Sequence, residues 1–419
     1  MFDAIVVGAG YTGMLTALAL ASRTHSRARV ALIDRRDPTA PPPRIDTRAS
    51  ALSRATVNLL IRTGIWPRLE AQACPVARIA ITDPVGDSPL RETLLRYENR
   101  LDDGPASFIV ENEQLRQALV AAIEAQDGLV LLPPAAVTGL DVETHAARLV
   151  TEDGDTVTGR VILACDGPSS PLREMAAIRT VGWEYGQAGI VATITHSADH
   201  ERVAAQHFLP AGPLAMLPLP GRRTSIVWAE STCRARELDA LDDKAFTAAL
   251  AERIGTRLGE IALVTGTRAS WPLRLQLARS LTANRLCLFG EAARTVHPLA
   301  GQGLNIAARD AAAFADVAGD ALALGIDPGN AATLDGYSRA RRFDASMSAL
   351  AFDALNRLFA MRAPIVRSLR DAGLEWVDRS PRLKEIFVRE AAGLAGDDVP
   401  SLMRNAPARG RQPADAGAL

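Results

Sequence analysis

The chain opens with Phe2-Asp-Ala-Ile-Val-Val7-Gly8-Ala-Gly10-Tyr-Thr-Gly13, an apolar run that ends in three spaced glycines. A short apolar run predicts a buried strand, and the apolar residues from Met14 to Ser22 predict a buried helix. Glycines at this spacing between a strand and a helix are typical of a dinucleotide-binding turn. The first allows the tight turn, the second lets backbone approach a pyrophosphate, and the third lets helix and strand pack closely.

A second apolar strand is predicted from Arg29 to Asp34. Its terminal acid lies about twenty residues beyond the glycines, where a carboxylate can accept hydrogen bonds from an adenosine ribose. The N–H groups at the start of the preceding helix can stabilise phosphate charge. Strand, glycines, helix, strand and acid together predict an ADP-containing cofactor.

Two distant segments decide between the cofactors FAD and NAD(P). Val161 to Cys165 predicts a buried strand that ends in Asp166-Gly167, and Arg285 to Phe289 predicts another that ends in Gly290-Glu291-Ala-Ala-Arg294. A glycine-rich stretch follows the second strand and leads into a helix from Ile306 onward. A nicotinamide domain needs no such returning segments, whereas a flavin domain needs an acid and a helix start beside the ribityl chain and the flavin ring. The sequence therefore predicts FAD.

Composition limits the other classes of function. With 419 residues, 48% hydrophobic and 23% charged, the chain has the profile of a globular protein with more than one core. With a net charge of −1, the chain has no overall positive charge that would attract nucleic acid. The six histidines and four cysteines form no metal-ligand or disulfide pattern, so no metal site is expected. The apolar start lacks a positive flank and contains Tyr11, so we expect neither a signal peptide nor a membrane span.

The same motifs resemble a known enzyme family. Gly8-x-Gly10-x-x-Gly13, Cys165-Asp166-Gly167, and Gly290-Glu291 with the stretch from His297 to Asn305 resemble the three fingerprints of FAD-dependent aromatic hydroxylases of the p-hydroxybenzoate hydroxylase fold. Further segments are similar to the ubiquinone-biosynthesis (polyprenylphenol) hydroxylases. They are Asp46-Thr-Arg48, Val110-Glu111-Asn112, Gln206 to Pro218 and Ser225 to Trp228, and the resemblance extends from Met1 to about Gly396.

The resemblance implies the residues of the site. The cofactor-binding residues would be Gly8, Gly10, Gly13, Asp34, Arg48, Asn112, Asp166, Gly290, Glu291, Gly303, Leu304 and Asn305. Pro298, Gly301, Gln302 and Gly303 would form the catalytic environment of the flavin, with no essential acid or base assigned. Phe208, Leu214, Met216 and Trp228 would line the substrate cavity, with an ordinary hydrophobic core as the alternative.

Three positions depart from the family pattern. Asp34 stands where glutamate is frequent, Glu291 stands where aspartate is usual, and Arg294 replaces a histidine. Glu291 keeps the carboxylate. Arg294 places a cation near the flavin loop, where it would bind phosphate or alter flavin chemistry.

The implied fold is α/β, a Rossmann-like FAD-binding domain interleaved with an α+β lobe built on a substrate-binding sheet. The expected FAD-binding parts are residues 1–80, 101–182 and 272–336, and the substrate-binding parts are residues 81–100 and 183–271. A C-terminal helical region at 337–404 and a disordered tail at 405–419 complete the prediction. The apolar and arginine-rich pattern of residues 350–370 favours either packing within the protein or contact with a membrane.

The implied activity is that of a flavoprotein monooxygenase that hydroxylates the ring of a prenylated phenol in ubiquinone biosynthesis, through a flavin C4a-hydroperoxide. Dioxygen is the expected co-substrate, and electrons would come from transient NAD(P)H or an external reductase. A cytoplasmic enzyme is expected, with peripheral contact to the inner face of the membrane, a ubiquinone-biosynthesis complex and a homo-oligomer left open. A hydroxylase of another aromatic or polyketide substrate and a non-catalytic FAD-binding assembly protein remain the alternatives.

Overall fold

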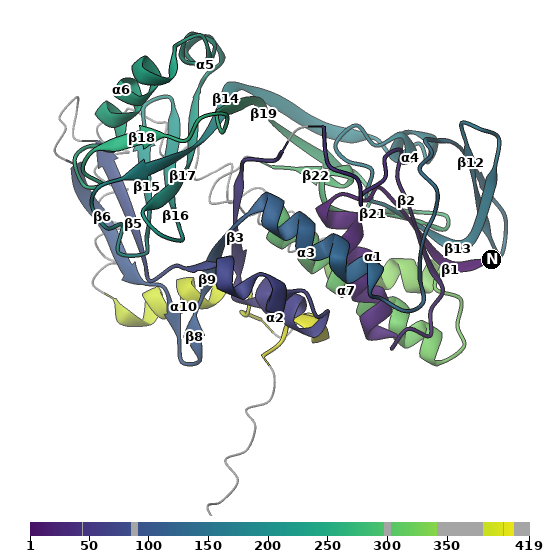
Figure 1. The fold of residues 1–419 in the computed structure, drawn as a ribbon. Helices are drawn as coiled ribbons and strands as arrows, with labels where there is room; N and C mark the ends of the chain where they lie inside the picture. Colours follow the sequence, from purple (N-terminus) through teal and green to yellow (C-terminus); the bar gives the residue numbers. More distant parts are fainter. Residues whose placement is uncertain (44, 85–90, 297–302, 342–379, 397, 406–419) are drawn as a thin grey trace, which may run out of the picture.

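A computed structural model describes residues 1–43, 45–84, 91–296, 303–341, 380–396 and 398–405. Its first sheet has eight strands, and five of them run parallel through the centre of one lobe (Figure 1). The path of this sheet is β10 (Leu129–Leu131), β2 (Val30–Ile33), β1 (Phe2–Val7), β13 (Thr156–Ala164), β12 (Ala147–Thr151) and β11 (Val137–Val142), while β21 (Leu286–Leu288) pairs with β13 and β20 (Thr282–Ala283). The predicted strand Phe2–Val7 is confirmed with the same bounds.

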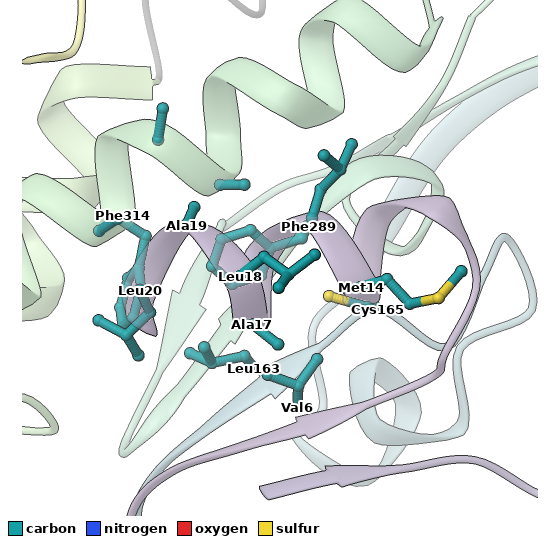
Figure 2. Close-up of a cluster of buried hydrophobic side chains, with 14 of the residues drawn as sticks. Val6, Met14, Ala17, Leu18, Ala19, Leu20, Leu163, Cys165, Phe289 and Phe314 are labelled. Carbon is teal, nitrogen blue, oxygen red and sulfur yellow. The ribbon is translucent and has the colours of Figure 1, made fainter. Parts of the chain in front are cut away.

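Helix α1 (Tyr11–Arg23) packs between this sheet and helix α7 (Gly303–Ala323). The helix begins inside the glycine turn, earlier than the predicted Met14, because Tyr11, Thr12 and Gly13 form its first turn. Figure 2 shows Met14, Ala17 and Leu18 of α1 beside side chains of the central strands. Nearly every residue of α1 after Thr12 is buried, which explains the uninterrupted apolar sequence.

The second large sheet has nine strands and forms the other lobe. Its path is β22 (Arg294–Thr295), β19 (Ala269–Ala278), β14 (Thr180–His196), β17 (Arg223–Ser231), β16 (Gly212–Leu219), β15 (Val203–Leu209), β5 (Arg78–Pro84) and β6 (Arg91–Glu98), with β18 (Ile261–Leu263) beside β14. The long strands β14 and β19 continue from this sheet towards the first lobe (Figure 1).

The two faces of the nine-stranded sheet have different neighbours. Helices α5 (Thr232–Asp239) and α6 (Asp243–Ile254) cover the outer face, where Phe246 and Leu250 pack on alternate residues of the strands. The inner face packs against a small sheet of β3 (Ala49–Ser53), β9 (Ser107–Glu111) and β4 (Cys74–Pro75) through Ala215, Leu217 and Leu219. Arg223 on the inner face also donates two hydrogen bonds, of 3.0 and 2.7 Å, to the carboxylate of Glu111.

Further elements are α2 (Arg54–Arg62), α3 (Asn112–Glu124), α4 (Pro171–Met175), α10 (Pro381–Ala391), the strand pair β7 (Arg100–Leu101) and β8 (Gly104–Pro105), and the 3₁₀ turns η1 (Trp66–Arg68), η2 (Glu70–Gln72), η3 (Gly290–Ala292) and η5 (Ser401–Met403). Residues 331–341 are also helical. Helices α2 and α3 contribute buried leucines to the core of the first lobe.

The predicted α/β class, with a parallel nucleotide-type sheet and a second β-sheet lobe, is confirmed. Segments of the first sheet come from residues 2–33, 129–164 and 282–288, on both sides of the strands that build the second. The exact domain boundaries remain a prediction. The whole amphipathic stretch at 350–370 and all of the predicted tail except its first residue lie outside the described residues.

Candidate FAD site

Four parallel strands bring the predicted cofactor residues to one edge. Strands β1, β2, β13 and β21 pair in parallel with one another, so their carboxyl ends lie together. Gly8 follows β1, Asp34 follows β2, Asp166 follows β13 and Gly290 follows β21. In open α/β sheets, ligands bind in the crevice outside the carboxyl ends of the strands. Residues far apart in the sequence therefore meet where a dinucleotide would bind.

The three glycines of the turn are required for different reasons. A Cβ atom on Gly8 would lie 2.4 Å from the carbonyl oxygen of Cys165, and Gly8 has a φ of +100°. A Cβ atom on Gly13 would lie 1.7 Å from the carbonyl oxygen of Gly8. Among the described residues, no atom beyond Gly10 and its chain neighbours lies within 4 Å of the Cβ position of Gly10, which is therefore open. Gly10 is also the N-cap of α1 and offers no side chain to cap it, so the helix start suits an anion.

Asp34 lies beside the glycine turn. Its Oδ2 accepts a hydrogen bond of 2.6 Å from the backbone N–H of Ala9, and its Oδ1 accepts one of 3.0 Å from Arg36. A carboxylate has about four acceptor sites, so both oxygens can still accept from ribose hydroxyls. The residue thus links the second strand to the turn and keeps capacity for the cofactor.

Asp166 carries an unsatisfied acceptor. Its Oδ2 accepts from the backbone N–H of Leu172 at 3.1 Å, whereas Oδ1 is buried and has no hydrogen-bond partner among the described residues. Burial raises the pKa of this carboxyl above its ordinary value, although hydrogen bonds from Ser170 and Leu172 act in the opposite direction. An orphaned acceptor at the strand edge fits a hydroxyl donor of a bound cofactor.

Gly290 and Glu291 form the turn η3 directly after β21. Gly290 has a φ of +52°, and a Cβ atom there would lie 2.6 Å from Oγ1 of Thr12 in the first turn of α1. The Gly290 N–H donates to Asp310 on α7 at 3.3 Å. Glu291 is exposed and contributes electrostatically to raising the pKa of Arg48. The third segment thus lies against the helix that begins at the dinucleotide turn.

A hydrogen-bonded network joins the glycine turn to Arg48 and Asn112. The Asp46 carboxylate accepts hydrogen bonds from Tyr11 at 3.1 Å, from Asn112 at 2.9 Å and twice from the guanidinium of Arg48, at 2.8 and 2.7 Å. The guanidinium of Arg48 lies over the ring of Trp271, 5.2 Å from its centroid. Arg48 is exposed, while Asn112 is buried and also accepts from Ser50.

The ionisation of this network is set by its central carboxylate. Burial acts to raise the pKa of Asp46, but the hydrogen bonds and charge of Arg48 outweigh it and hold the pKa below its ordinary value. The hydrogen bond to Asp46 raises the pKa of Arg48. Burial, together with the charge of Asp46, raises the pKa of Tyr11, so its phenol stays protonated and donates. The sequence prediction does not include Tyr11 and Asp46 among the site residues. The aromatic side chain of Tyr11 inside a glycine turn is the feature of the sequence that could have pointed to it.

The flavin loop is only partly described. Pro298, Gly301 and Gln302, and also His297, lie outside the described residues. Gly303, Leu304 and Asn305 form the first turn of α7. The side chain of Asn305 is buried, accepts from the Ser53 N–H and the Thr56 hydroxyl, and donates to the Ala51 carbonyl. The Asn305 side chain therefore anchors α7 to β3 and α2, and the backbone of this turn, not the Asn305 amide, is free to face a cofactor.

Arg294 points into the protein. It is buried, and its Nη1 lies 3.2 Å from Oδ1 of Asp310, a fully buried carboxylate on α7. Nε of Arg341 also lies 2.7 Å from this oxygen. The sequence suggests phosphate binding or an effect on flavin chemistry for Arg294. It does not suggest an interior ion pair. Asp310 is thus shared by Arg294 and Arg341, and its other oxygen accepts from the Gly290 N–H.

The four predicted substrate-lining residues separate onto two faces of the sheet. Leu214, Met216 and Trp228 belong to the core between the nine-stranded sheet and helices α5 and α6, which was the alternative reading. The prediction that they line a cavity facing the cofactor is not supported by this packing. Phe208 alternates with Leu209, which is in that core, and therefore lies on the inner face.

Two further observations concern the described part of the chain as a whole. None of its helices has the length and apolar character needed to span a bilayer. Its His, Cys, Asp and Glu side chains nowhere gather in threes that could hold a metal ion.

Comparisons with known proteins agree with this geometry. The model of a family described as "FAD binding domain" matches residues 1–349. A ubiquinone hydroxylase, UbiL, from Rhodospirillum rubrum is 39% identical over 410 residues, which covers 97% of this chain and 93% of that protein. A 3-demethoxyubiquinol 3-hydroxylase from Escherichia coli is 31% identical over 398 residues, covering 93% and 98% of the two chains.

A solved structure has the same fold. The crystal structure of p-nitrophenol 4-monooxygenase PnpA from Pseudomonas putida superposes with a TM-score of 0.76 at 18% identity. The superposition covers 94% of this chain and 98% of that one. At this identity the likeness concerns the fold alone, and it includes both lobes.

Proposed function

Because the chain belongs to the FAD-binding domain family of flavin-dependent monooxygenases, we propose that it hydroxylates the aromatic ring of a polyprenylated phenol in ubiquinone biosynthesis. The observation that carries the proposal is the likeness to a ubiquinone hydroxylase over 97% of this chain. That likeness includes the nine-stranded sheet, which the dinucleotide turn alone would not explain. When bound, FAD supplies the redox chemistry that activates dioxygen.

The residues of this chain would bind and orient the cofactor. The open backbone at Gly10 and the start of α1 would receive the pyrophosphate, and Asp34 would accept from the ribose. The buried Oδ1 of Asp166 would accept from a hydroxyl of the ribityl chain, while Glu291 would lie beside the same part of the cofactor. Arg48 and Asn112, held by Asp46, would lie near the flavin ring. The backbone from Gly303 to Asn305 would point the start of α7 at the flavin ring, with Pro298, Gly301 and Gln302 completing the loop.

The inner face of the nine-stranded sheet would form one wall of the substrate site. Its described residues are mostly apolar and include Phe208, Ala229 and Leu273, which suits a prenylated substrate and excludes water from the reacting ring. Dioxygen would be the co-substrate. Because a single G-x-G-x-x-G turn is available for FAD, NAD(P)H would bind transiently or an external reductase would supply electrons.

A prenyl tail partitions into bilayers. We therefore place the enzyme in the cytoplasm, with peripheral contact to the inner face of the membrane. It would act there alone, as a homo-oligomer or within a ubiquinone-biosynthesis complex. A polar aromatic or polyketide substrate is disfavoured by the apolar inner face. Arg294 is buried and paired with Asp310, so this departure from the family pattern gives no support to a non-catalytic FAD-binding assembly protein.

Gene deletion and complementation test this function. The deletion strain should accumulate a ubiquinone precursor that lacks one ring hydroxyl, identified by mass spectrometry, and the wild-type gene should restore ubiquinone. A Gly13→Val variant, which cannot form the glycine turn, should not restore it. An unchanged quinone profile in the deletion strain would exclude the proposed role.

A further inference from the structure

Gln187 lies on the inner face of the nine-stranded sheet. In the register of β14 with β17, Gln187 pairs with Ser231 and Gly189 pairs with Ala229. In the register of β17 with β16, Val227 pairs with Ala215, which packs on the small sheet. Since directly paired residues share a face and side chains alternate along a strand, Gln187, Gly189 and Ala229 lie on that same inner face.

The side-chain amide of Gln187 is held in one orientation. Its Nε2 donates to the carbonyl oxygen of Ala211, in the turn between β15 and β16. A carbonyl accepts only, so the amide nitrogen must be the atom that faces it. The amide oxygen, Oε1, is buried and has no hydrogen-bond partner among the described residues. The chain thus presents a fixed, unsatisfied acceptor.

The backbone around Gln187 is shaped to allow this arrangement. The pairing of β14 with β19 is interrupted between Glu184 and Ala188, and Gly186 in this bulge has a φ of +67°. On the other side, a Cβ atom on Gly212 would lie 2.8 Å from Cβ of Ala229 and 3.2 Å from Nε2 of Gln187. Bulges re-aim side chains next to functional sites. Here, the bulge and the space left by Gly212, which has no side chain, allow the amide of Gln187 to lie against the sheet.

The surroundings of Gln187 connect it to the cofactor residues. Trp271 pairs with Gly189 and so shares the inner face, and Leu273 lies within 3.1 Å of the Cβ position of Gly189. Arg48 lies over Trp271, and Asp46 ties Arg48 to Tyr11 in the glycine turn. The buried acceptor therefore lies on the part of the sheet that faces the cofactor network, with apolar Phe208, Ala229 and Leu273 on the same face.

We propose that Gln187 is a specificity-determining residue, whose amide oxygen accepts a hydrogen bond from the ring hydroxyl of the phenol substrate. The inference rests on the proposed function, because it takes the ligand to be an apolar phenol. A phenol hydroxyl is a hydrogen-bond donor. A buried acceptor without a partner therefore binds a ligand with such a donor more tightly than an analogue that lacks it, because the analogue leaves the acceptor unsatisfied. A neutral amide oxygen also favours the protonated phenol over the phenolate, since two acceptors cannot bond to each other.

Ligand discrimination by the FAD-loaded protein tests this inference. The holoenzyme is titrated with a short-chain prenylated phenol and with its O-methyl ether, and the dissociation constants are read from the change in flavin absorbance. The wild-type protein should bind the phenol about tenfold more tightly than the ether. Gln187→Leu should bind both ligands equally, and KM for the phenol should rise by a similar factor.

Two further variants separate a local role from a general one. Gln187→Met keeps the length of the side chain and should lose discrimination in the same way if the leucine variant fails to fold. Ser225→Ala removes another buried, unpaired inner-face atom, at a position paired with Leu217 in the contact with the small sheet, and should keep the full discrimination. Flavin content and melting temperature serve as the measures of folding.

The outcomes distinguish this inference from the proposed function. If Gln187→Leu or Gln187→Met still prefers the phenol about tenfold, Gln187 does not bind the hydroxyl, although the proposed function stands. If the wild-type holoenzyme neither binds nor hydroxylates any prenylated phenol, the proposed function fails and the inference falls with it.

Discussion

The hydroxyl of Tyr11, in the first turn of α1, donates a hydrogen bond of 3.1 Å to Oδ2 of Asp46. This contact ties the dinucleotide turn to the segment that positions Arg48 and Asn112. A single carboxylate therefore couples the residues expected around the phosphates to those expected around the flavin ring.

Replacing Tyr11 with phenylalanine tests that coupling. A hydrogen bond to a charged group contributes about 1.5 to 3 kcal/mol, so Tyr11→Phe should weaken FAD binding by at least about tenfold. Fluorescence titration of the apoprotein with FAD measures this change. Tyr97→Phe changes a tyrosine whose pKa burial raises to about 12 and which packs near α10, away from the network, and it should leave FAD affinity unchanged. Equal FAD affinity in Tyr11→Phe and wild type would show that the contact plays no part in cofactor binding.

Gly13 should tolerate no side chain. A Cβ atom would lie 1.7 Å from the Gly8 carbonyl oxygen, so Gly13→Ala must displace the turn, and we expect protein that retains no flavin after purification. Gly154→Ala is the control for adding a methyl group, because the Cβ position of Gly154 is open. Unlike Gly13, Gly154 has a positive φ, of +84°. This variant should lose about 1 kcal/mol of stability and keep its flavin. The absorbance ratio of flavin to protein decides between the two outcomes.

Asp166 should destabilise the apoprotein at neutral pH. Its pKa in the folded protein is raised above the ordinary value of 3.8, so the folded state loses stability as pH rises from that value through the raised pKa. Asp166→Asn should therefore raise the melting temperature of apoprotein at about pH 7, with a smaller gain as pH falls towards the ordinary pKa of Asp.

The same variant should weaken cofactor binding. The amide oxygen would accept from Leu172, as Oδ2 does now, and the NH₂ group would then replace the orphaned Oδ1 and could not accept from a hydroxyl. Melting curves across pH and FAD titration measure the two effects, with the exposed Asp153→Asn as control. If the Asp166→Asn apoprotein is less stable than wild type at neutral pH, the ionised Asp166 carboxylate does not destabilise the fold.

Asp310 should be far more important for stability than an exposed carboxylate. Asp310→Ala leaves Arg294 and Arg341 buried without their shared acceptor, and removing one partner of a buried pair costs about 3 to 5 kcal/mol. Glu143→Gln breaks the exposed pair of Glu143 with Arg148 and should cost less than about 1 kcal/mol. Chemical denaturation of both variants gives the comparison, and similar costs would argue against an interior ion cluster.

Local rules in the sequence predicted the nucleotide lobe well. The strand Phe2–Val7 has its predicted bounds, because an apolar run and a glycine turn fix both of its ends. Parallel pairing then brings Asp34, Asp166 and Gly290 together, which the order of strand, turn and acid already implied.

Long-range packing limited the rest of the prediction. Phe208 and Leu214 are both apolar residues on neighbouring strands, and the alternation along a strand does not show which face helices α5 and α6 will cover. The direction of Arg294 depends on Asp310 and Arg341, which lie on later helical segments. Gln187 belongs to no motif, and only the bulge and the turn at Ala211 reveal its role as an oriented acceptor.

As a monooxygenase, this chain should insert one oxygen atom from dioxygen into the ring of a prenylated phenol. The most direct measurement supplies the FAD-loaded protein with a prenylated phenol, a reductant and dioxygen labelled with heavy oxygen, and follows the product by mass spectrometry. We predict a phenol that carries one additional labelled oxygen atom on its ring, formed only when protein, FAD, reductant and dioxygen are all present. Flavin reduction and reoxidation with no labelled product, for any prenylated phenol tested, would show that the chain is not a hydroxylase of such phenols.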